Sequence, residues 1–484
     1  MIQLDAITLR GVGSYIRGSR LSVRPLTILS GINGSGKSTW LKSLEMLRRS
    51  LDHLPFAFAV DDSNAFDVEF MNYPLYCSSD LTSMADDEEE HQFGPPACIG
   101  VEFTATEDVD LGEPSASGIG IGVAQQFLLQ GQCPKGTRLR VRIAHPTSNT
   151  DSHVIPETPG MTHHVELKIN EVLIAFRRPH RPDGRNIERS DYTLYRSSVP
   201  FPGLGEAALR DLVASRIRWI MRKFFDGYFH ISAVRSLPQP LKTGFPSPPD
   251  DNHARRDVHR NGDYTLNVFY WNSRPEPPES LSPDRIAPPV FGELEKGVDN
   301  ALRDLVDVKL THEWDDADLG RFTNAFLTGA QVPRQLSSGF HQLFPIIVQL
   351  AVMRPGELLS IENPEVHLHP DLQLEVSEYL LGQSRQNRRV MIETHSDLII
   401  RRVIRAILDE EDALSQQHVS LNFTDAETGA DDRTGSVLHP FGVDAATGRI
   451  EWPKGFMDAS INESQRLMDV MYGRNRNRDG EETE

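Results

Sequence analysis

The stretch Gly31-Ile32-Asn33-Gly34-Ser35-Gly36-Lys37-Ser38-Thr39 decides how this 484-residue chain folds. It fits the pattern G-x-x-x-x-G-K-[ST] of a phosphate-binding loop, which connects a strand to a helix. The apolar run at 26–29 predicts a buried strand before the loop. Four apolar residues at helical spacing predict a helix after it that buries one face: Trp40, Leu41, Leu44 and Leu47. The local context is therefore the one that this motif requires.

The glycines of the loop let successive backbone N–H groups point at one spot, to which the helix N-terminus adds its positive end. Lys37 is expected to reach the β- and γ-phosphates, and the Ser38 hydroxyl to ligate Mg²⁺. A glycine-rich turn without a ligand is the alternative, but the flanking strand and helix favour binding of a nucleoside triphosphate. The candidate binding residues are Gly31, Asn33, Gly34, Ser35, Gly36, Lys37, Ser38 and Thr39.

The composition is that of an ordinary globular protein, with 38% hydrophobic and 25% charged residues. The sequence contains no run of 18 or more apolar residues, so no membrane span is predicted. The first residues lack the basic and apolar regions of a signal peptide, so we do not expect secretion. Three widely spaced cysteines, Cys77, Cys98 and Cys133, suggest neither disulfides nor a zinc site. A cytoplasmic location is therefore expected.

The net charge of −19 argues against a protein that coats nucleic acid, since neutralising phosphates needs clustered Lys and Arg. A local patch could still bind DNA. The densest candidate is Arg177-Arg178-Pro179-His180-Arg181, followed by Arg185 and Arg189. Solvated loop charge is the simpler interpretation of this patch.

Changes of pattern along the chain predict its organisation. Residues 1–24 are expected to form two short strands around a glycine turn, and the acidic run Asp86–Glu90 a solvated loop. Alternating apolar residues between 98 and 178 predict antiparallel strands, whereas 205–225 and 291–306 have helical spacing. Residues 236–290, rich in Pro, Asp and Arg, are expected to form a long loop. No coiled-coil arm is predicted.

Three further motifs follow residue 330 in a fixed order. Leu336–Gln342 resembles the signature loop of ATP-binding-cassette ATPases, and Glu357–Glu365 resembles their Walker B strand. Arg389–Asp397 resembles the strand that ends in the switch histidine. The phrase Ile361–Pro370 is similar to the overcoming-lysogenisation-defect (OLD) type, which groups with RecF and the heads of structural-maintenance-of-chromosomes (SMC) proteins. Two phrases narrow the resemblance to a bacterial subgroup of OLD-like ATPases: Ile231–Arg235 and Trp452–Asp458.

The resemblance implies an α/β fold of the P-loop NTPase class, with a mostly parallel sheet flanked by helices. An antiparallel β-subdomain and a helical subdomain are expected as insertions. The expected units are an N-terminal lobe (1–60), the β-subdomain (61–200), a helical subdomain with the long loop (201–330), a C-terminal lobe (331–425) and a small extension (426–484).

The three motifs also suggest chemistry. Glu362 follows a buried strand, where a carboxylate can hold Mg²⁺ through its waters; a surface ion pair is the alternative. The turn Ser337-Ser338-Gly339 enters an apolar helix, whose N-terminus would present donors to phosphate or simply be capped. In resembling ATPases this loop contacts the nucleotide of a second subunit, which implies a homodimer with ATP between two heads. His395 could hydrogen-bond the γ-phosphate or the attacking water, or be an ordinary strand-end histidine.

The chain departs from the cassette pattern at Asn363, where most cassette ATPases have a catalytic glutamate. An amide can orient water but cannot accept its proton, so we expect slow hydrolysis, with Glu365 as the residue that supplies the base. The catalytic candidates are thus Glu362, Asn363, Glu365 and His395. The spacing of Glu365, His367 and His369 also suggests a metal site, but the resemblance assigns that loop to the dimer interface.

Many OLD-type proteins carry a topoisomerase-primase nuclease domain, but Asp425-Ala426-Glu427 is a poor match to its metal-binding set. We therefore expect an ATP-driven sensor or switch that controls a separate effector, a nuclease or toxin, in bacterial anti-phage defence. A RecF-like DNA-repair ATPase is the first alternative, and salt-dependent DNA binding would favour it. A scaffold that ATP stabilises without much hydrolysis is the second.

Overall fold

The computed structural model describes most of the chain. The described residues are 1–15, 18–51, 54–55, 97–110, 123–145, 162–179, 192–198, 201, 204–236, 249–273, 292–311, 321–324, 336–409, 417–428, 434–444, 447–450, 452–453, 456 and 463–470. The predicted acidic loop at 86–90 and all of the Arg patch beyond residue 179 lie outside this set.

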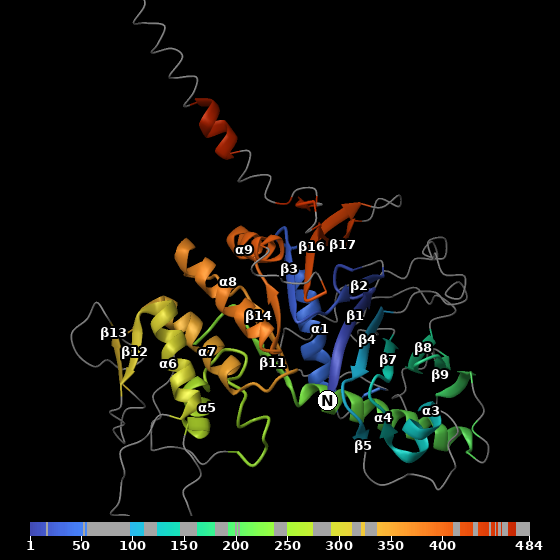
Figure 1. The fold of residues 1–484 in the computed structure, drawn as a ribbon. Coiled ribbons are helices and arrows are strands. Elements are labelled where there is room, and N and C mark those ends of the chain that lie inside the picture. The colour runs from blue at the N-terminus through green and yellow to red at the C-terminus, as the bar shows by residue number, and fades with distance from the viewer. Residues whose placement is uncertain are drawn as a thin grey trace, which may run out of the picture.

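A six-stranded sheet forms the centre of the molecule, in the order β11-β14-β15-β3-β16-β17 (Figure 1). The first five of these strands are parallel, and β17 is antiparallel at the edge. Their bounds are β3 (Leu26–Gly31), β11 (Tyr228–Ile231), β14 (Leu358–Glu362), β15 (Arg389–Glu393), β16 (Val419–Thr428) and β17 (Thr434–Phe441). The predicted strand at 26–29 and the predicted α/β class are confirmed.

Helices cover both faces of this sheet, which is why its strands are apolar on both sides. Successive residues of β3 point to opposite faces, so that Ile28 joins one hydrophobic core and Leu29 the other. On one side pack the helices α5 (Thr265–Ser273), α6 (Glu293–Val306), α7 (Ser338–Val352), α8 (Pro370–Arg385) and α9 (Asp397–Leu408). On the other side lie α1 (Lys37–Arg49) and α4 (Glu206–Phe225).

Beyond α1 and α4 lies a seven-stranded antiparallel sheet in the order β10-β9-β8-β7-β4-β1-β2. The alternating residues that predicted it are buried, as at Val101, Val141 and Leu167. Its strands are β1 (Ile2–Arg10), β2 (Ser19–Ser22), β4 (Ala97–Ala105), β7 (Arg138–His145), β8 (Thr162–Ile169), β9 (Val172–Pro179) and β10 (Thr193–Ser197).

Short elements complete the fold. They are β5 (Val109–Asp110), α3 (Val123–Gln125), the π-helical turn η2 (Gln126–Gln130), β6 (Gln132–Cys133), β12 (Val308–Thr311), β13 (Arg321–Asn324), β18 (Val443–Asp444) and β19 (Arg449–Ile450). A further helical stretch covers 463–470, at the end of the described chain. No helix among the described residues is both long enough and apolar enough to span a bilayer.

One expectation is wrong: the stretch 236–290 is not simply a loop, because it contains helix α5. Three apolar residues of α5, Leu266, Phe269 and Trp271, are buried in the core around α7. A short helix that buries polar residues such as Thr265 and Asn267 along with its apolar ones has no one-sided periodicity to reveal it.

The sheets also cross the expected domain boundaries. Strands β1 and β2 belong to the antiparallel sheet, although they precede the phosphate-binding loop in sequence. Strand β11, within the expected helical subdomain, and β17, beyond residue 425, both belong to the central sheet. Each of the two large sheets is therefore built from segments that are distant in sequence.

Candidate nucleotide-binding site

The phosphate-binding loop follows β3 at the carboxyl end of the central sheet, where open parallel sheets bind their ligands. Two of its glycines are required by the backbone. Gly31 has φ 146° and Gly36 has φ 86°. A Cβ at Gly31 would overlap the carbonyl oxygen of Thr424, and one at Gly36 would overlap the Ser14 hydroxyl. Helix α1 then begins at Lys37, so the loop ends at a helix N-terminus, as the motif predicts.

Residues from β16 and β17 hold this loop from behind, and sequence reasoning missed them. The hydroxyls of Ser35 and Thr424 share a hydrogen bond of 2.6 Å, and the Thr424 hydroxyl is 3.1 Å from the Ser30 carbonyl oxygen. The Ser436 hydroxyl donates to that of Ser14 at 2.6 Å. No motif surrounds these residues, so the sequence offered no signal for their role.

Lys37 and Ser38 lie next to the carboxylate of Glu393. The ammonium group of Lys37 is buried and donates to the carbonyl oxygens of Gly31 (3.0 Å) and Ile32 (2.7 Å). Burial lowers the pKa of Lys37, and the negative charge of Glu393 partly opposes this. The Ser38 hydroxyl donates to Oε1 of Glu393 at 2.6 Å. At the tip of the loop, Asn33 is exposed.

Glu362 lies at the end of β14, two strands from the loop, and its carboxylate is held in place. Its Oε2 accepts from the backbone N–H of Ala233 at 3.2 Å, and its Oε1 is 3.5 Å from Nε2 of His230. Burial alone would raise the pKa of Glu362, but the contacts with His230 and Ala233 outweigh it and lower the pKa. Behind this contact, Nδ1 of His230 lies 2.8 Å from the Ser360 hydroxyl. Glu362 is thus kept ionised, as a cation ligand needs to be.

Glu393, the last residue of β15, is the acidic residue of the site that sequence reasoning missed. It pairs in register with Glu362 on one side and Leu29 of β3 on the other. Its side chain is buried, and Oε2 has no hydrogen-bond partner. Burial raises the pKa of Glu393, and the charge of Glu362 adds to the effect. Its position at the end of the predicted switch strand, two residues before His395, was the available signal.

The remaining catalytic candidates lie on the loops that follow β14 and β15. Oε1 of Glu365 accepts from the backbone N–H of His395 at 2.8 Å, while its Oε2 is buried without a partner. Burial, and then the charge of Lys37, lowers the pKa of His395, so the ring is neutral at pH 7. Asn363 adopts a left-handed conformation (φ 45°), which asparagine tolerates better than most residues. The structure therefore brings Glu365 and His395 together.

The signature turn starts α7. Ser337 caps the helix by accepting from the N–H of Phe340 at 3.3 Å, which confirms the capping interpretation. Ser337 and Ser338 are nevertheless exposed, and Gly339 lies against Leu368 and Leu372 of the loop and helix that follow β14. The buried Arg235 joins this helix to the Walker B strand.

Arg235 is a further site residue whose role the sequence did not reveal, although it ends one of the resembling phrases. Its guanidinium donates to Oε1 of Gln342 in α7 at 2.8 Å and to the backbone oxygen of Glu362 at 2.6 Å. Burial lowers its pKa to about 10, so it keeps its charge at neutral pH. Because this one side chain bonds to both elements, a movement of α7 would be transmitted to the end of β14.

The donor set suits Mg²⁺. The Ser38 hydroxyl and Oε1 of Glu393 lie 2.6 Å apart, and Oε2 of Glu393 is a buried acceptor without a donor. No group of three or more His, Cys, Asp or Glu in the described part of the chain could hold an ion alone. A cation here would take its other ligands from phosphate and water, as Mg²⁺ does. Bound Mg²⁺ would neutralise charge on the phosphates.

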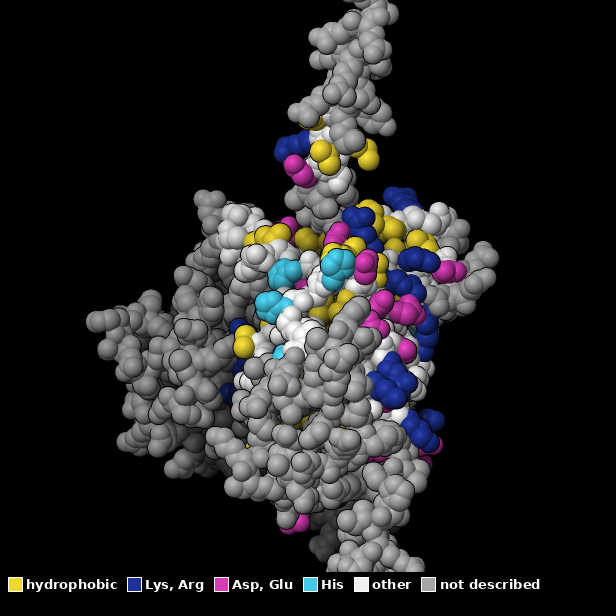
Figure 2. Space-filling model, turned by 90° about the vertical axis from the view of Figure 1, so that its left-hand side faces the viewer, with side chains coloured by type: hydrophobic (Ala, Val, Ile, Leu, Met, Phe, Trp, Pro, Cys, Tyr) yellow, Lys and Arg dark blue, Asp and Glu magenta, His cyan; other side chains and the backbone are white. Residues whose placement is uncertain are grey.

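The alternative metal set at 365–369 is not assembled. His367 and His369 are exposed, and His369 caps α8 by accepting from the N–H of Asp371 at 3.4 Å. Figure 2 shows several histidines on the face it views, with Lys and Arg interspersed among acidic side chains there. Among the described residues this face is of mixed charge.

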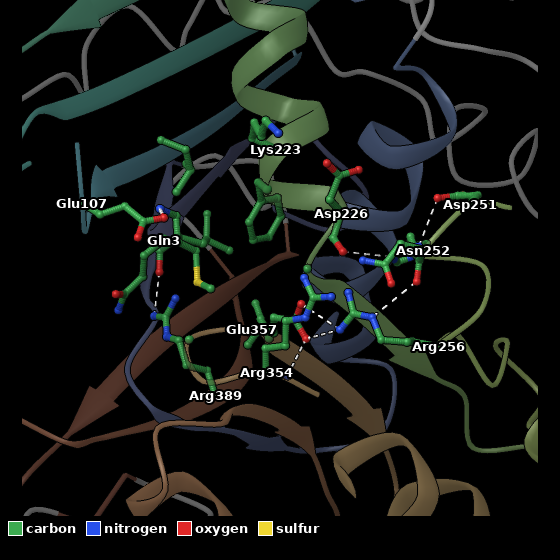
Figure 3. A pocket seen from close by; sticks show the side chains of 18 residues that line it. Gln3, Glu107, Lys223, Asp226, Asp251, Asn252, Arg256, Arg354, Glu357 and Arg389 are labelled. Atoms are coloured by element: carbon green, nitrogen blue, oxygen red, sulfur yellow. Dashed lines mark hydrogen bonds and ion pairs between the residues drawn. The ribbon is translucent and has the colours of Figure 1, made fainter. Parts of the chain in front are cut away.

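A separate cavity of about 380 Å³ lies at the opposite, amino end of β14 and β15. Figure 3 shows the Arg256 and Glu357 side chains pointing toward each other beside Arg354. Arg256 donates to both oxygens of Glu357, at 2.9 and 2.7 Å. This cavity is distinct from the phosphate-binding loop.

The fold and this site define a P-loop ATPase with an α/β fold. A protein-family model described as "AAA domain, putative AbiEii toxin, Type IV TA system" matches residues 171–401, a little under half of the chain. The match covers the signature, Walker B and switch segments but not the phosphate-binding loop. No curated protein matches the chain.

Several solved structures are similar at low identity. An SMC head bound to the C-winged helix domain of ScpA is 12% identical, with 92% of this chain and 99% of that chain covered and a TM-score of 0.42. The SMC head domain from Thermotoga maritima is 10% identical, with 91% and 100% covered and a TM-score of 0.36. The SMC head with an extended coiled coil, bound to the C-terminal domain of ScpA from Pyrococcus furiosus, is 10% identical, with 92% and 98% covered and a TM-score of 0.39. At these scores no property of those proteins is transferred to this chain.

Proposed function

We propose that this chain is an ATP-dependent switch that closes as a homodimer around Mg·ATP, hydrolyses it slowly and controls a separate effector, a nuclease or toxin, in bacterial anti-phage defence. One observation carries the proposal. Lys37, Ser38 and His395 meet at the carboxyl end of the central sheet, whereas Ser337 and Ser338 are exposed at the start of another helix. The toxin–antitoxin wording of the matching family supports the assignment to defence.

The exposed start of α7 is the reason to expect a dimer. A helix N-terminus presents unpaired N–H groups and a partial positive charge, and here two serine hydroxyls lie beside them. These donors suit the γ-phosphate of a nucleotide held by a second copy of the chain. ATP would then act as the contact that both copies share, and its hydrolysis would release them.

The acidic residues of the site support slow hydrolysis. Asn363 can orient water but cannot take its proton. Glu365 has a buried oxygen without a partner and is hydrogen-bonded to the backbone of His395, so it is well placed to act as the predicted base. With Glu365 as the only base, hydrolysis is slow, and the switch therefore stays bound to ATP for a long time.

Assembly tests the dimer. Sedimentation of the purified chain should show a monomer without nucleotide and a dimer with Mg²⁺ and a non-hydrolysable ATP analogue. Lys37→Ala should lose both nucleotide binding and assembly. Ser337→Arg should bind nucleotide but stay monomeric. The larger arginine side chain would prevent the start of α7 from approaching the γ-phosphate of the nucleotide held by the second copy.

Ser215→Arg is the matched control, since Ser215 is exposed on α4 and belongs to none of the motifs. It should assemble like the wild type. A wild-type chain that neither binds ATP nor changes its assembly state would contradict the proposal.

Turnover tests the role of Glu365. Because a general base contributes about 10²- to 10⁴-fold, Glu365→Gln should lower kcat by this range while nucleotide affinity stays unchanged. Single-turnover rates with radiolabelled ATP separate the two quantities. Undiminished turnover in this variant would remove Glu365 from the mechanism.

A further inference from the structure

Glu393 occupies a position that the motifs do not explain. It ends the strand that lies between the strand of the phosphate-binding loop and the Walker B strand. Its backbone is in register with Glu362, so two carboxylates leave adjacent strand ends together. The hydroxyl expected to ligate Mg²⁺, that of Ser38, is hydrogen-bonded to Glu393 and not to Glu362.

The two carboxylates are held differently. Both oxygens of Glu362 have a neighbour, Ala233 N–H and His230. Glu393 has one oxygen at Ser38, and the other is buried with no partner. A buried acceptor without a donor is destabilising, and a second carboxylate nearby adds repulsion. Such an arrangement is stable in a protein that places a cation there.

We propose that Glu393 and Glu362, together with Ser38, form a two-carboxylate Mg²⁺ site beneath the phosphate-binding loop. The inference rests on the proposed ATPase function and deepens it, because the motifs assign the acidic role to Glu362 alone. Glu393 holds the cation next to Ser38, where the phosphates of the nucleotide reach it. Glu362, in register with Glu393 on the next strand, supplies the second carboxylate.

Manganese binding measures this site without relying on activity. Mn²⁺ replaces Mg²⁺ at oxygen sites, and the loss of its free electron-paramagnetic-resonance signal reports binding. The full chain, saturated with ADP, is titrated with Mn²⁺ for the wild type, Glu393→Gln, Glu393→Asp and Ser38→Ala. Glu365→Gln is the control, since it neutralises a carboxylate of the same region that the proposal leaves outside the metal site.

Glu393→Gln should weaken the apparent affinity for Mn²⁺ by at least about 10- to 100-fold, because losing a direct ligand costs no less than losing a residue that supports one. Ser38→Ala should have a similar effect, and Glu393→Asp a smaller one because it keeps the charge. The affinity of Glu365→Gln for Mn²⁺ should equal that of the wild type. Binding of a fluorescent ADP in EDTA should be equal in the wild type and Glu393→Gln.

Other outcomes overturn the inference. If Glu393→Gln binds Mn²⁺ as the wild type does but turns over slowly, Glu393 is a base and not a ligand. If Glu393→Gln fails to fold, unchanged Mn²⁺ affinity in both Ser38→Ala and Glu393→Asp overturns the proposal. A wild-type chain that binds no nucleotide would contradict the proposed function itself. The ADP measurement therefore distinguishes failure of the proposed function from failure of the metal site alone.

Discussion

The two ends of the central sheet carry buried charge in opposite ways. At the amino end, Arg256 and Glu357 satisfy each other, and the backbone N–H of Arg354 completes the carboxylate at 2.7 Å. At the carboxyl end, Glu365 and Glu393 each keep one buried oxygen without a partner. The same strands, β14 and β15, connect both ends. The ion pair at the amino end stabilises the fold. The unpaired carboxylate oxygens at the carboxyl end are instead available to a ligand that the chain itself does not supply.

Breaking the amino-end pair should give the largest effect. Arg256→Ala leaves Glu357 buried and uncompensated, which costs about 3–5 kcal/mol of unfolding free energy. Urea denaturation measures the loss, and nucleotide affinity of the folded protein should not change. The double variant Arg256→Met with Glu357→Leu should recover most of the stability, because it removes both charges. A weaker ADP affinity in the folded single variant would show that the two ends are coupled.

Two glycine variants at the carboxyl end should differ from each other. Gly31→Ala forces an unfavourable φ of 146° and an overlap with the Thr424 backbone, whereas Gly34→Ala, at φ 77°, meets open space. We expect about 1–3 kcal/mol of strain at Gly34 and a larger cost at Gly31. Fluorescent ADP binding should therefore weaken more for Gly31→Ala. Equal effects would mean that β16 does not hold the loop.

The smallest effect concerns Glu393 and pH. Because its folded pKa is raised above the ordinary 4.5, this group stabilises the fold fully below that pH and loses the contribution as pH rises through the folded pKa. In metal-free buffer, Glu393→Gln should thus be more stable than the wild type at pH 8, with the difference shrinking toward pH 4. Thermal melts across this range check the sign. Greater wild-type stability at pH 8 would contradict the raised pKa.

Much of the fold was predictable because it depends on local patterns. Strand β3, helix α1 and the alternating strands of the antiparallel sheet follow from hydrophobic periodicity, and the loop between β3 and α1 follows from its glycines. Helix α5 was missed because it buries polar and apolar residues alike and so lacks a one-sided apolar pattern. The boundaries were less predictable, since β1 joins β4 across nearly a hundred residues, a pairing that no local signal specifies.

The site divides in the same way. The motifs identified Lys37, Ser38, Glu362 and His395, because each follows a strand whose carboxyl end must face the same edge of the sheet. They did not identify Glu393 or Thr424, whose roles arise only from contacts across the sheet, at 2.6 Å to Ser38 and 2.6 Å to Ser35.

The sequence by itself determined that this chain has a phosphate-binding loop at the start of a helix and an α/β fold around it, since these depend on residue type and spacing. Only the tertiary structure decided which carboxylate meets the loop, which hydroxyls support it and how Arg235 joins α7 to β14. The reason is physical: strand order and register bring together side chains hundreds of residues apart, and no local pattern records which strands become neighbours.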